Sequence, residues 1–220
     1  LEEIAEDAYP VLAELDIDCE REVARIMAFI REQLADANRS RVVLGLSGGI
    51  DSALCAALCA EAAGRENVRA LVLPYFTSNP ESEAHALLVA RQLGIPYERW
   101  DITPMVRPLL DWYPAMDERR KGNIMARVRM IVLFDQSTLH DGLVVGTSNR
   151  TEALLGYFTM HGDAAAAFKP IAHLYKCQVR ALARHCGLPE VIIAKPPSAD
   201  LWAGQTDEGE LGFTYDQADQ

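Results

Sequence analysis

A short loop between two apolar segments constrains the fold of this chain most. Val42 to Leu46 form a short apolar run, the loop Ser47-Gly48-Gly49-Ile50-Asp51-Ser52 follows, and an alanine- and leucine-rich segment then continues to Gly64. A wholly apolar run of this length is typical of a strand buried on both faces, and the segment after the loop has the length of a helix. The sequence therefore predicts a strand, a tight loop and a helix, the unit from which parallel sheets are built.

The loop has the chemistry of a phosphate-binding site. Adjacent glycines allow positive φ angles and a close approach of the backbone, so that successive N–H groups point into one concavity. The start of the following helix adds partial positive charge, and the hydroxyls of Ser47 and Ser52 add donors. Asp51 would repel a bare polyphosphate, and its presence therefore predicts a Mg²⁺ ion between the carboxylate and the phosphates.

Two other interpretations of the loop remain open from the sequence. It could be a plain turn with Ser or Asp as a helix cap. Gly45-Leu46-Ser47-Gly48-Gly49 also fits the Gly-x-Ser-x-Gly elbow of hydrolases, in which Ser47 would be the nucleophile. Such a hydrolase needs a later acid and a histidine, and the chain offers Asp135 or Asp141 with His161, His173 or His185. A Walker A loop is excluded because the chain contains no Gly-Lys pair.

The remaining pattern alternates strands with helices. Apolar runs predict further strands at 68–73, 97–102 and 143–146, and apolar positions three or four residues apart predict helices at 23–34, 80–94, 122–139 and 176–186. This alternation predicts an α/β fold with a doubly wound parallel sheet, organised as a single domain over residues 1–220. The acidic run 207–210 reads as a solvated loop or a lid.

Composition narrows the classes of partner. The chain has 21 Lys plus Arg against 32 Asp plus Glu, a formal charge of −11, which argues against a nucleic-acid partner because phosphate backbones bind basic faces. No apolar stretch reaches the roughly 18 residues expected of a membrane span. Five cysteines without zinc-type spacing favour a reducing compartment, and we expect a cytoplasmic protein.

Four separated segments carry a resemblance to a known family. The loop at 45–52 resembles the pyrophosphatase loop of ATP pyrophosphatases. The runs Gly122-Asn123-Ile124-Met125-Ala126-Arg127, Val144-Val145-Gly146-Thr147-Ser148-Asn149-Arg150-Thr151-Glu152 and Lys195-Pro196-Pro197-Ser198-Ala199-Asp200-Leu201 are similar, in order and spacing, to NAD synthetases. The match extends from about residue 20 to 217 and favours the ammonia-dependent type, because the chain has no room for a glutaminase domain.

The resemblance implies a fold and a reaction. The fold is a doubly wound, mostly parallel five-stranded sheet flanked by helices, of the Rossmann-like type found in the adenine nucleotide alpha hydrolase-like superfamily. The reaction is the amidation of nicotinic acid adenine dinucleotide (deamido-NAD) by ammonia, with ATP as co-substrate and AMP and pyrophosphate as products. An adenylated carboxylate is the intermediate. The family also implies a homodimer, and the apolar positions Ile124, Val128, Ile131 and Val132 could form its contact or belong to the monomer core.

The resemblance also assigns site residues. It implies that Asp51 and Glu152 bind Mg²⁺ and that Arg127 binds the deamido-NAD substrate. It assigns catalytic roles to Asp51 and Lys176. The residues implied to bind ATP are Gly45, Leu46, Ser47, Gly48, Gly49, Ile50, Asp51, Ser52, Thr147, Lys176 and Ser198.

The chain departs from the family at two positions. A Lys and an Asp that help to bind the dinucleotide fall on Met160 and Ala167, which cannot make charge-assisted hydrogen bonds. The chain also ends at Gln220, before the family's usual C-terminal segment. Another amidotransferase of the GMP-synthetase type, or a catalytically weakened adenine-nucleotide-binding module, are the alternative functions.

Overall fold

The computed structural model describes residues 15–198 and 205–219, and a parallel sheet forms its centre. Its strands are β1 (Arg41–Gly45), β2 (Val68–Val72), β3 (Tyr97–Arg99) and β4 (Gly142–Val144). They lie in the order β3-β2-β1-β4, and every neighbouring pair is parallel. The predicted α/β fold with a doubly wound sheet is confirmed.

The expected count of five strands is wrong for the described residues, which form four. Beyond β4 the sheet continues only as a single parallel bridge between Val145 and Phe168. Lys169 and Pro170 follow Phe168, and a proline has no N–H group with which to extend the ladder. The chain therefore leaves the sheet edge after one bridge.

Helices surround the sheet. The helices predicted from periodicity are present, and the structure adds short helices that the sequence did not predict, at 103–111, 150–155, 190–193, 207–211 and 215–218. In the described part of the chain the helices are α1 (Cys19–Asp36), α2 (Ile50–Ala63), α3 (Pro80–Leu93), α4 (Thr103–Asp111), α5 (Glu118–Leu139), α6 (Arg150–Leu155), α7 (Lys176–His185), α8 (Glu190–Ile193), α9 (Asp207–Leu211) and α10 (Tyr215–Ala218), with a 3₁₀ turn at Arg65–Asn67.

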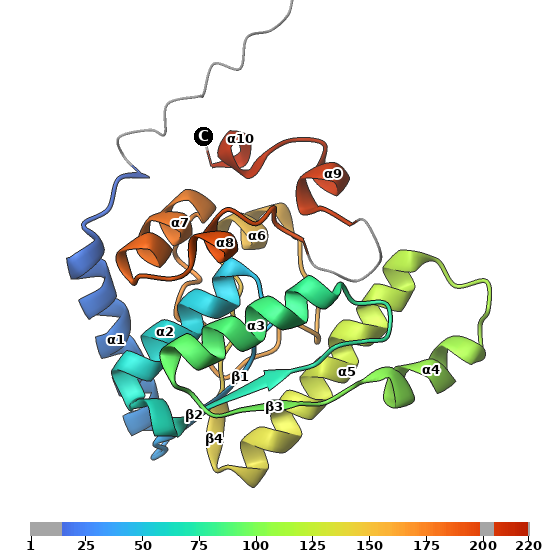
Figure 1. Cartoon of the computed structure of the whole chain (residues 1–220), viewed down its shortest axis with the longest axis horizontal. Coiled ribbons are helices and arrows are strands. Elements are labelled where there is room, and N and C mark those ends of the chain that lie inside the picture. The colour runs from blue at the N-terminus through green and yellow to red at the C-terminus, as the bar shows by residue number, and fades with distance from the viewer. Residues whose placement is uncertain (1–14, 199–204, 220) are drawn as a thin grey trace, which may run out of the picture.

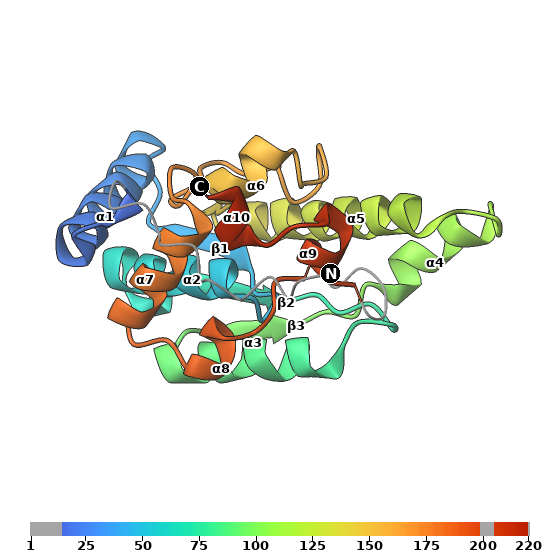
Figure 2. The same ribbon diagram turned by 90° about the horizontal axis from the view of Figure 1, so that it is seen from above.

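The alternation of side chains along β1 sorts the core into two layers. Val42 and Leu44 pack with α1, α2, α3 and α7, whereas Val43 faces the opposite cluster with Val128 and Val132 of α5. All five side chains are at most 4% exposed. Since successive strand residues point to opposite faces, one apolar strand joins both layers. Figures 1 and 2 show α2 and α3 on one side of the sheet and α5 on the other.

The carboxyl edge of the sheet is where the chain reverses its winding. The connection from β1 through α2 leads to β2 on one side of β1, and β4 pairs with β1 on its other side. A crevice at such a switch point is the usual ligand position in open α/β sheets. The late elements α9 and α10 lie near α6 and α7 at this end of the molecule (Figure 1). No helix in the described part of the chain has the length and apolar character to cross a membrane.

Candidate nucleotide-binding site

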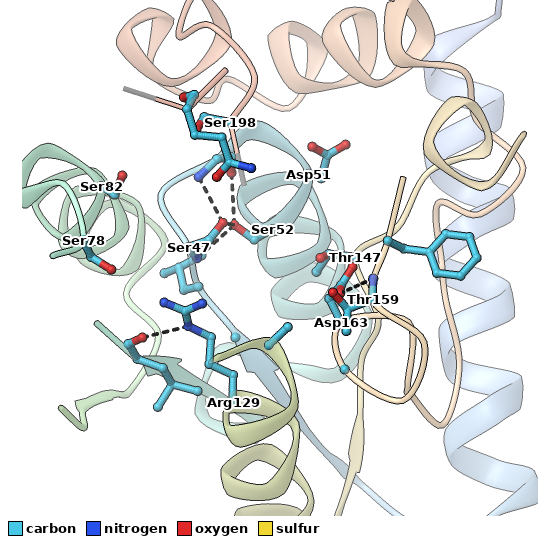
Figure 3. Close-up of a pocket in the computed structure, with 18 of the residues that line it drawn as sticks. Ser47, Asp51, Ser52, Ser78, Ser82, Arg129, Thr147, Thr159, Asp163 and Ser198 are labelled. Carbon is cyan, nitrogen blue, oxygen red and sulfur yellow. Dashed lines mark hydrogen bonds between the residues drawn. The ribbon is translucent and has the colours of Figure 1, made fainter. Parts of the chain in front are cut away.

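A cavity of about 770 Å³ lies at the switch point. Segments far apart in the sequence line it: the loop after β1, the ends of β2 and β4, the start of α3, one side of α5, and the residues around Ser198 and Asp207. Figure 3 shows Ser47 and Ser52 at one wall, with Thr147, Thr159 and Asp163 across from them. The site predicted from the loop sequence is therefore a real concavity.

The glycine pair is needed because other backbone comes very close. Gly48 has a φ of +80°, and a Cβ built on it would lie 2.1 Å from the backbone oxygen of Ser82 in α3. Any larger residue would both strain the backbone and push the loop and α3 apart. Gly49 is the N-cap of α2 and has no side chain to cover the first N–H groups of that helix. Those amides can therefore receive an anion.

Hydroxyl groups hold the loop in shape. Ser47 Oγ and Ser52 Oγ lie 3.0 Å apart, and Ser52 Oγ also accepts from the backbone N–H of Ser47 at 3.2 Å. Ser47 Oγ accepts from Gly49 N at 3.3 Å. Leu46 and Ile50 are buried in the core, 2% and 7% exposed, so they anchor the two ends of the loop.

These contacts do not support the hydrolase interpretation. A nucleophilic serine needs a histidine within hydrogen-bond reach, held in turn by an acid. Ser47 Oγ instead contacts Ser52 Oγ, and among the described residues no histidine lines the cavity.

Behind the loop, one ammonium group joins two carboxylates. Lys176 Nζ donates to Asp51 Oδ2 at 2.6 Å and lies 3.4 Å from Glu152 Oε1. The side chain of Lys176 is 3% exposed, and each carboxylate is 17% exposed. Three helices meet here, because Asp51 is in the first turn of α2, Glu152 in that of α6, and Lys176 begins α7.

Asn149 fixes the two carboxylates relative to each other. Its side chain accepts from Glu152 N at 2.9 Å, while the Glu152 carboxylate accepts from Asn149 N at 3.2 Å, which makes a capping box. Its amide nitrogen also donates to Asp51 Oδ1 at 2.9 Å. The sequence resemblance did not single out Asn149, although the spacing Asn-x-x-Glu is itself a capping-box signal.

The charges of this cluster perturb one another. Burial and the neighbouring Asp51 carboxylate raise the pKa of Glu152, and Lys176 only partly opposes them. Burial lowers the pKa of Lys176, but the charges of Asp51 and Glu152 outweigh it, so the pKa lies above its usual value. Lys176 therefore stays protonated, and two carboxylates converge where a cation is held.

The structure brings to this cluster two residues that the sequence did not predict. The ring centroid of Tyr215 lies 4.9 Å from Lys176 Nζ, and Tyr215 Oη donates to Asp207 Oδ2 at 3.0 Å. Tyr215 is 0% exposed and Asp207 is 5% exposed. Asp207 belongs to the acidic run for which the sequence predicted a solvated loop or a lid, and the solvated alternative is wrong for this residue, because it begins the short helix α9 and accepts a buried hydrogen bond. Only a fold that packs α10 against α7, and so brings Tyr215 to both Lys176 and Asp207, could reveal the role of this residue.

Other predicted residues lie at the cavity rim. Thr147 lines the cavity at the end of β4, and Ser198 Oγ donates to the backbone oxygen of Gln205 at 2.7 Å. Lys195 Nζ donates to Ser82 Oγ at 3.0 Å on the same side. Residues 199–201, part of the motif that contains Ser198, lie outside the described residues.

Arg127 is separate from the other predicted residues. It is exposed on α5, its Nε donates to the backbone oxygen of Met160 at 3.3 Å, and it does not line the cavity. Arg129, two residues further along α5, does line the cavity and donates from Nε to Leu73 O at 3.0 Å. Burial raises the pKa of Asp163, which accepts from Thr159 N at 2.8 Å.

The fold and this cavity are those of a nucleotide-binding α/β enzyme, with a loop whose amides could receive phosphates and two carboxylates that could hold a cation. A family model described as NAD synthase matches residues 22–220. The chain therefore belongs to the NAD synthase family.

Individual relatives are similar over most of the chain. An NH(3)-dependent NAD(+) synthetase from Trichlorobacter lovleyi is 53% identical over 95% of this chain and 77% of its own length. The structure of NMN synthetase from Francisella tularensis has a TM-score of 0.88 at 34% identity, covering 93% of this chain and 85% of that one. The NH3-dependent NAD synthetase from Campylobacter jejuni has a TM-score of 0.78 at 40% identity, covering 81% and 77%.

These matches confirm the function expected from the resemblance. The chain is a ligase that forms a C–N bond in NAD biosynthesis, by ATP-dependent amidation of deamido-NAD with ammonia. Neither the GMP-synthetase-type alternative nor the binding module gains support from them.

The close contact at Gly48 gives a test of the loop. We expect Gly48→Ala to weaken ATP binding at least about tenfold, because the new Cβ meets the Ser82 backbone and must displace the loop. Gly187→Ala is the matched control, since Gly187 has a φ of +68° but nothing within 4 Å of its Cβ position. Calorimetric titration with ATP, beside thermal unfolding of both variants, measures the effect. Unchanged ATP affinity in Gly48→Ala would contradict it.

Proposed function

We propose that the cavity performs the adenylation step and that the loop at 45–52 binds the phosphates of ATP. The free N–H groups at the start of α2, the glycine backbone and the hydroxyls of Ser47 and Ser52 are the donors for the phosphate oxygens. Thr147, at the end of β4, and Ser198 also line the cavity, and both belong to the proposed nucleotide site. The observation that carries this proposal is the buried cluster of Asp51, Glu152 and Lys176 directly behind the loop.

The chemistry follows from the poor reactivity of a carboxylate. Ammonia does not displace an oxide anion, so the nicotinate carboxylate first attacks the α-phosphorus of ATP, and the bond to pyrophosphate breaks. Ammonia then attacks the carboxyl carbon, the bond to AMP breaks, and the nitrogen loses a proton. Negative charge grows on the departing groups in both steps. The protein's part is to hold donors and cations at those positions, a task that needs no protein nucleophile.

Asp51 and Glu152 are suited to hold Mg²⁺. Their carboxylates already converge on a cation, the ammonium of Lys176, and carboxylate oxygens together with phosphate oxygens are the ligands that Mg²⁺ prefers. When bound, the ion would neutralise charge on the phosphates. Lys176, at the same point, is the residue that would place its ammonium against the phosphate chain.

A coupled assay tests the proposed function. With the full chain, ATP, Mg²⁺ and deamido-NAD, we expect pyrophosphate release that depends on deamido-NAD, and NAD formation that depends on added ammonia. The same assay run with nicotinate mononucleotide tests a second substrate of the same site. ATP binding without either turnover would contradict the proposal and favour a binding module.

Separate observations support nicotinate mononucleotide as a second substrate. The Francisella tularensis neighbour with a TM-score of 0.88 is called an NMN synthetase, and amidation of nicotinate mononucleotide yields NMN. Met160, which is 62% exposed, and Ala167 offer no charged group to the second half of a dinucleotide. We expect a kcat/KM for the mononucleotide within about tenfold of that for deamido-NAD. Complete rejection of the mononucleotide would remove this second candidate.

Glu152→Gln tests the metal role without removing the helix cap. The amide can still accept from Asn149 N, so we expect the melting temperature to change little. The loss of one anionic ligand should lower kcat/KM about 10²-fold and shift the Mg²⁺ dependence to higher concentration. Glu190→Gln on the exposed end of α8 is the control. A variant with native Mg²⁺ dependence would contradict the assignment of Glu152.

We also propose that a second copy of this chain covers exposed apolar side chains on α5, on α6 and in the segment after α6. Ile131 is 53% exposed, Phe134 38%, and Leu154 and Met160 more than 60%, whereas Val128 and Val132 belong to the monomer core. Exposed apolar groups gathered in this way mark interaction surfaces. Arg127 lies beside Met160, and we place it at this contact, where it would reach the dinucleotide.

Ile131→Asp tests this contact. We expect the native chain to sediment as a dimer and the variant as a monomer, because a charge would be buried without a partner. Leu88→Asp, at a position 40% exposed on α3, controls for the added charge. A monomeric native chain, or a variant that still dimerises, would contradict the proposal, and analytical ultracentrifugation decides between them.

A further inference from the structure

The ring of Tyr215 approaches Lys176 from outside the cavity. Its centroid lies 4.9 Å from Nζ, within the roughly 6 Å over which a ring face attracts a cation. Asp51 and Glu152, the anionic partners of Lys176, both line the cavity, whereas Tyr215 does not. The ammonium group is therefore held by carboxylates on its cavity side and by an aromatic face behind it.

A buried hydrogen bond fixes the orientation of this ring. Tyr215 Oη donates to Asp207 Oδ2 at 3.0 Å, and Asp207 lines the cavity. Burial and the charge of Asp207 raise the pKa of Tyr215 above its usual value, so the phenol keeps its proton and stays a donor. The bond links the orientation of the ring to the start of α9.

The rest of α10 is anchored to the helices that carry the site. Asp219 accepts from Thr151 Oγ1 at 2.5 Å and from Cys177 N at 2.8 Å. Glu208 accepts from Tyr215 N at 3.0 Å. Since Thr151 neighbours Glu152 and Cys177 follows Lys176, these bonds set the ring against the cluster itself.

We propose that Tyr215 is a positioning residue for the adenylation reaction: its ring face keeps the Lys176 ammonium at the cavity wall when Asp51 and Glu152 bind a metal cation. In the described structure both carboxylates compensate Lys176. A cation bound by them weakens that attraction and repels the ammonium, whereas the attraction of the ring does not depend on either carboxylate. This inference rests on the proposed function of the cluster.

Two substitutions separate the ring face from the hydroxyl. Tyr215→Phe keeps the face and loses the bond to Asp207, whereas Tyr215→Leu loses both. We expect Tyr215→Leu to lower kcat about 10- to 30-fold, with a smaller change in the KM for ATP, and Tyr215→Phe to stay within about threefold of the native chain. Asp216→Asn, which breaks the exposed pair of α10 with Arg180, controls for general loosening of this helix and should keep native kinetics.

A graded ring series keeps the inference falsifiable if Tyr215→Leu fails to fold. Phenylalanine with one, two or three fluorine atoms at position 215 nearly preserves the size of the ring and progressively weakens the negative potential of its face. We expect kcat to fall stepwise with fluorination while the melting temperature stays nearly constant. Equal kcat across the series, or equal loss in Tyr215→Phe and Tyr215→Leu, would overturn the positioning role.

Calorimetric binding of Mg²⁺-ATP to the same series distinguishes this failure from a failure of the proposed function. If the native chain binds Mg²⁺-ATP but turns over neither pyridine substrate, the proposed function fails. A stepwise loss of Mg²⁺-ATP affinity along the series would then still support the hold on Lys176, and an unchanged affinity would overturn it.

Discussion

The buried contact of Lys176 with Asp51 and Glu152 is the interaction on which the site depends. It joins the first turns of three helices, α2, α6 and α7, that begin at the carboxyl edge of the sheet. Removing Lys176 would leave two carboxylates without their buried cation, a loss that typically costs about 3–5 kcal/mol, whereas Asp51 still compensates Lys176 when Glu152 is neutralised. The same arrangement keeps carboxylates and a cation beside the loop that we propose to bind phosphates. The same three side chains must therefore hold the helices together through their mutual contacts and also serve the proposed binding of a metal ion and phosphates. Asn149 fixes Asp51 by a hydrogen bond, and the ring of Tyr215 contacts Lys176.

The acidic composition of the chain is compatible with anionic ligands because the binding groups are local. A formal charge of −11 repels polyphosphates at long range, but this repulsion is screened over about 8–10 Å in physiological salt. In the proposed site, many of the donors are backbone amides, hydroxyls and a helix start, none of which changes the net charge. Together with Lys176 and a metal ion held by Asp51 and Glu152, these groups would make the site locally favourable for an anion on an acidic protein.

The central part of this architecture could be predicted from the sequence, since local patterns determine it. The run Val42 to Leu46 indicated β1, Asn79 and Gly94 marked the ends of α3, and the loop at 47–52 pointed to phosphate binding. The short helices α9 and α10 were missed, because their stability comes from contacts such as Tyr215 with Lys176 and Asp219 with Thr151, which join residues distant in the chain. The fifth strand was expected from the family, but Pro170 stops the ladder after Phe168. Periodicity alone does not distinguish two apolar faces of one helix, so the sequence left Val128 and Val132 either at a dimer contact or in the monomer core. The structure places both in the core.

The hydroxyl contact between Ser47 and Ser52 has a consequence for ligand affinity and product release. Before any ligand arrives, the two groups already satisfy each other at 3.0 Å, and Ser52 also donates to Gly49 O. A phosphate that accepts hydrogen bonds from these hydroxyls replaces bonds that already exist and adds few new ones. The two serines therefore contribute little net affinity. They hold the loop open in a preorganised shape, which lowers the conformational entropy lost on binding. In the proposed reaction, pyrophosphate would leave this loop readily, because the two hydroxyls return to each other as the product departs.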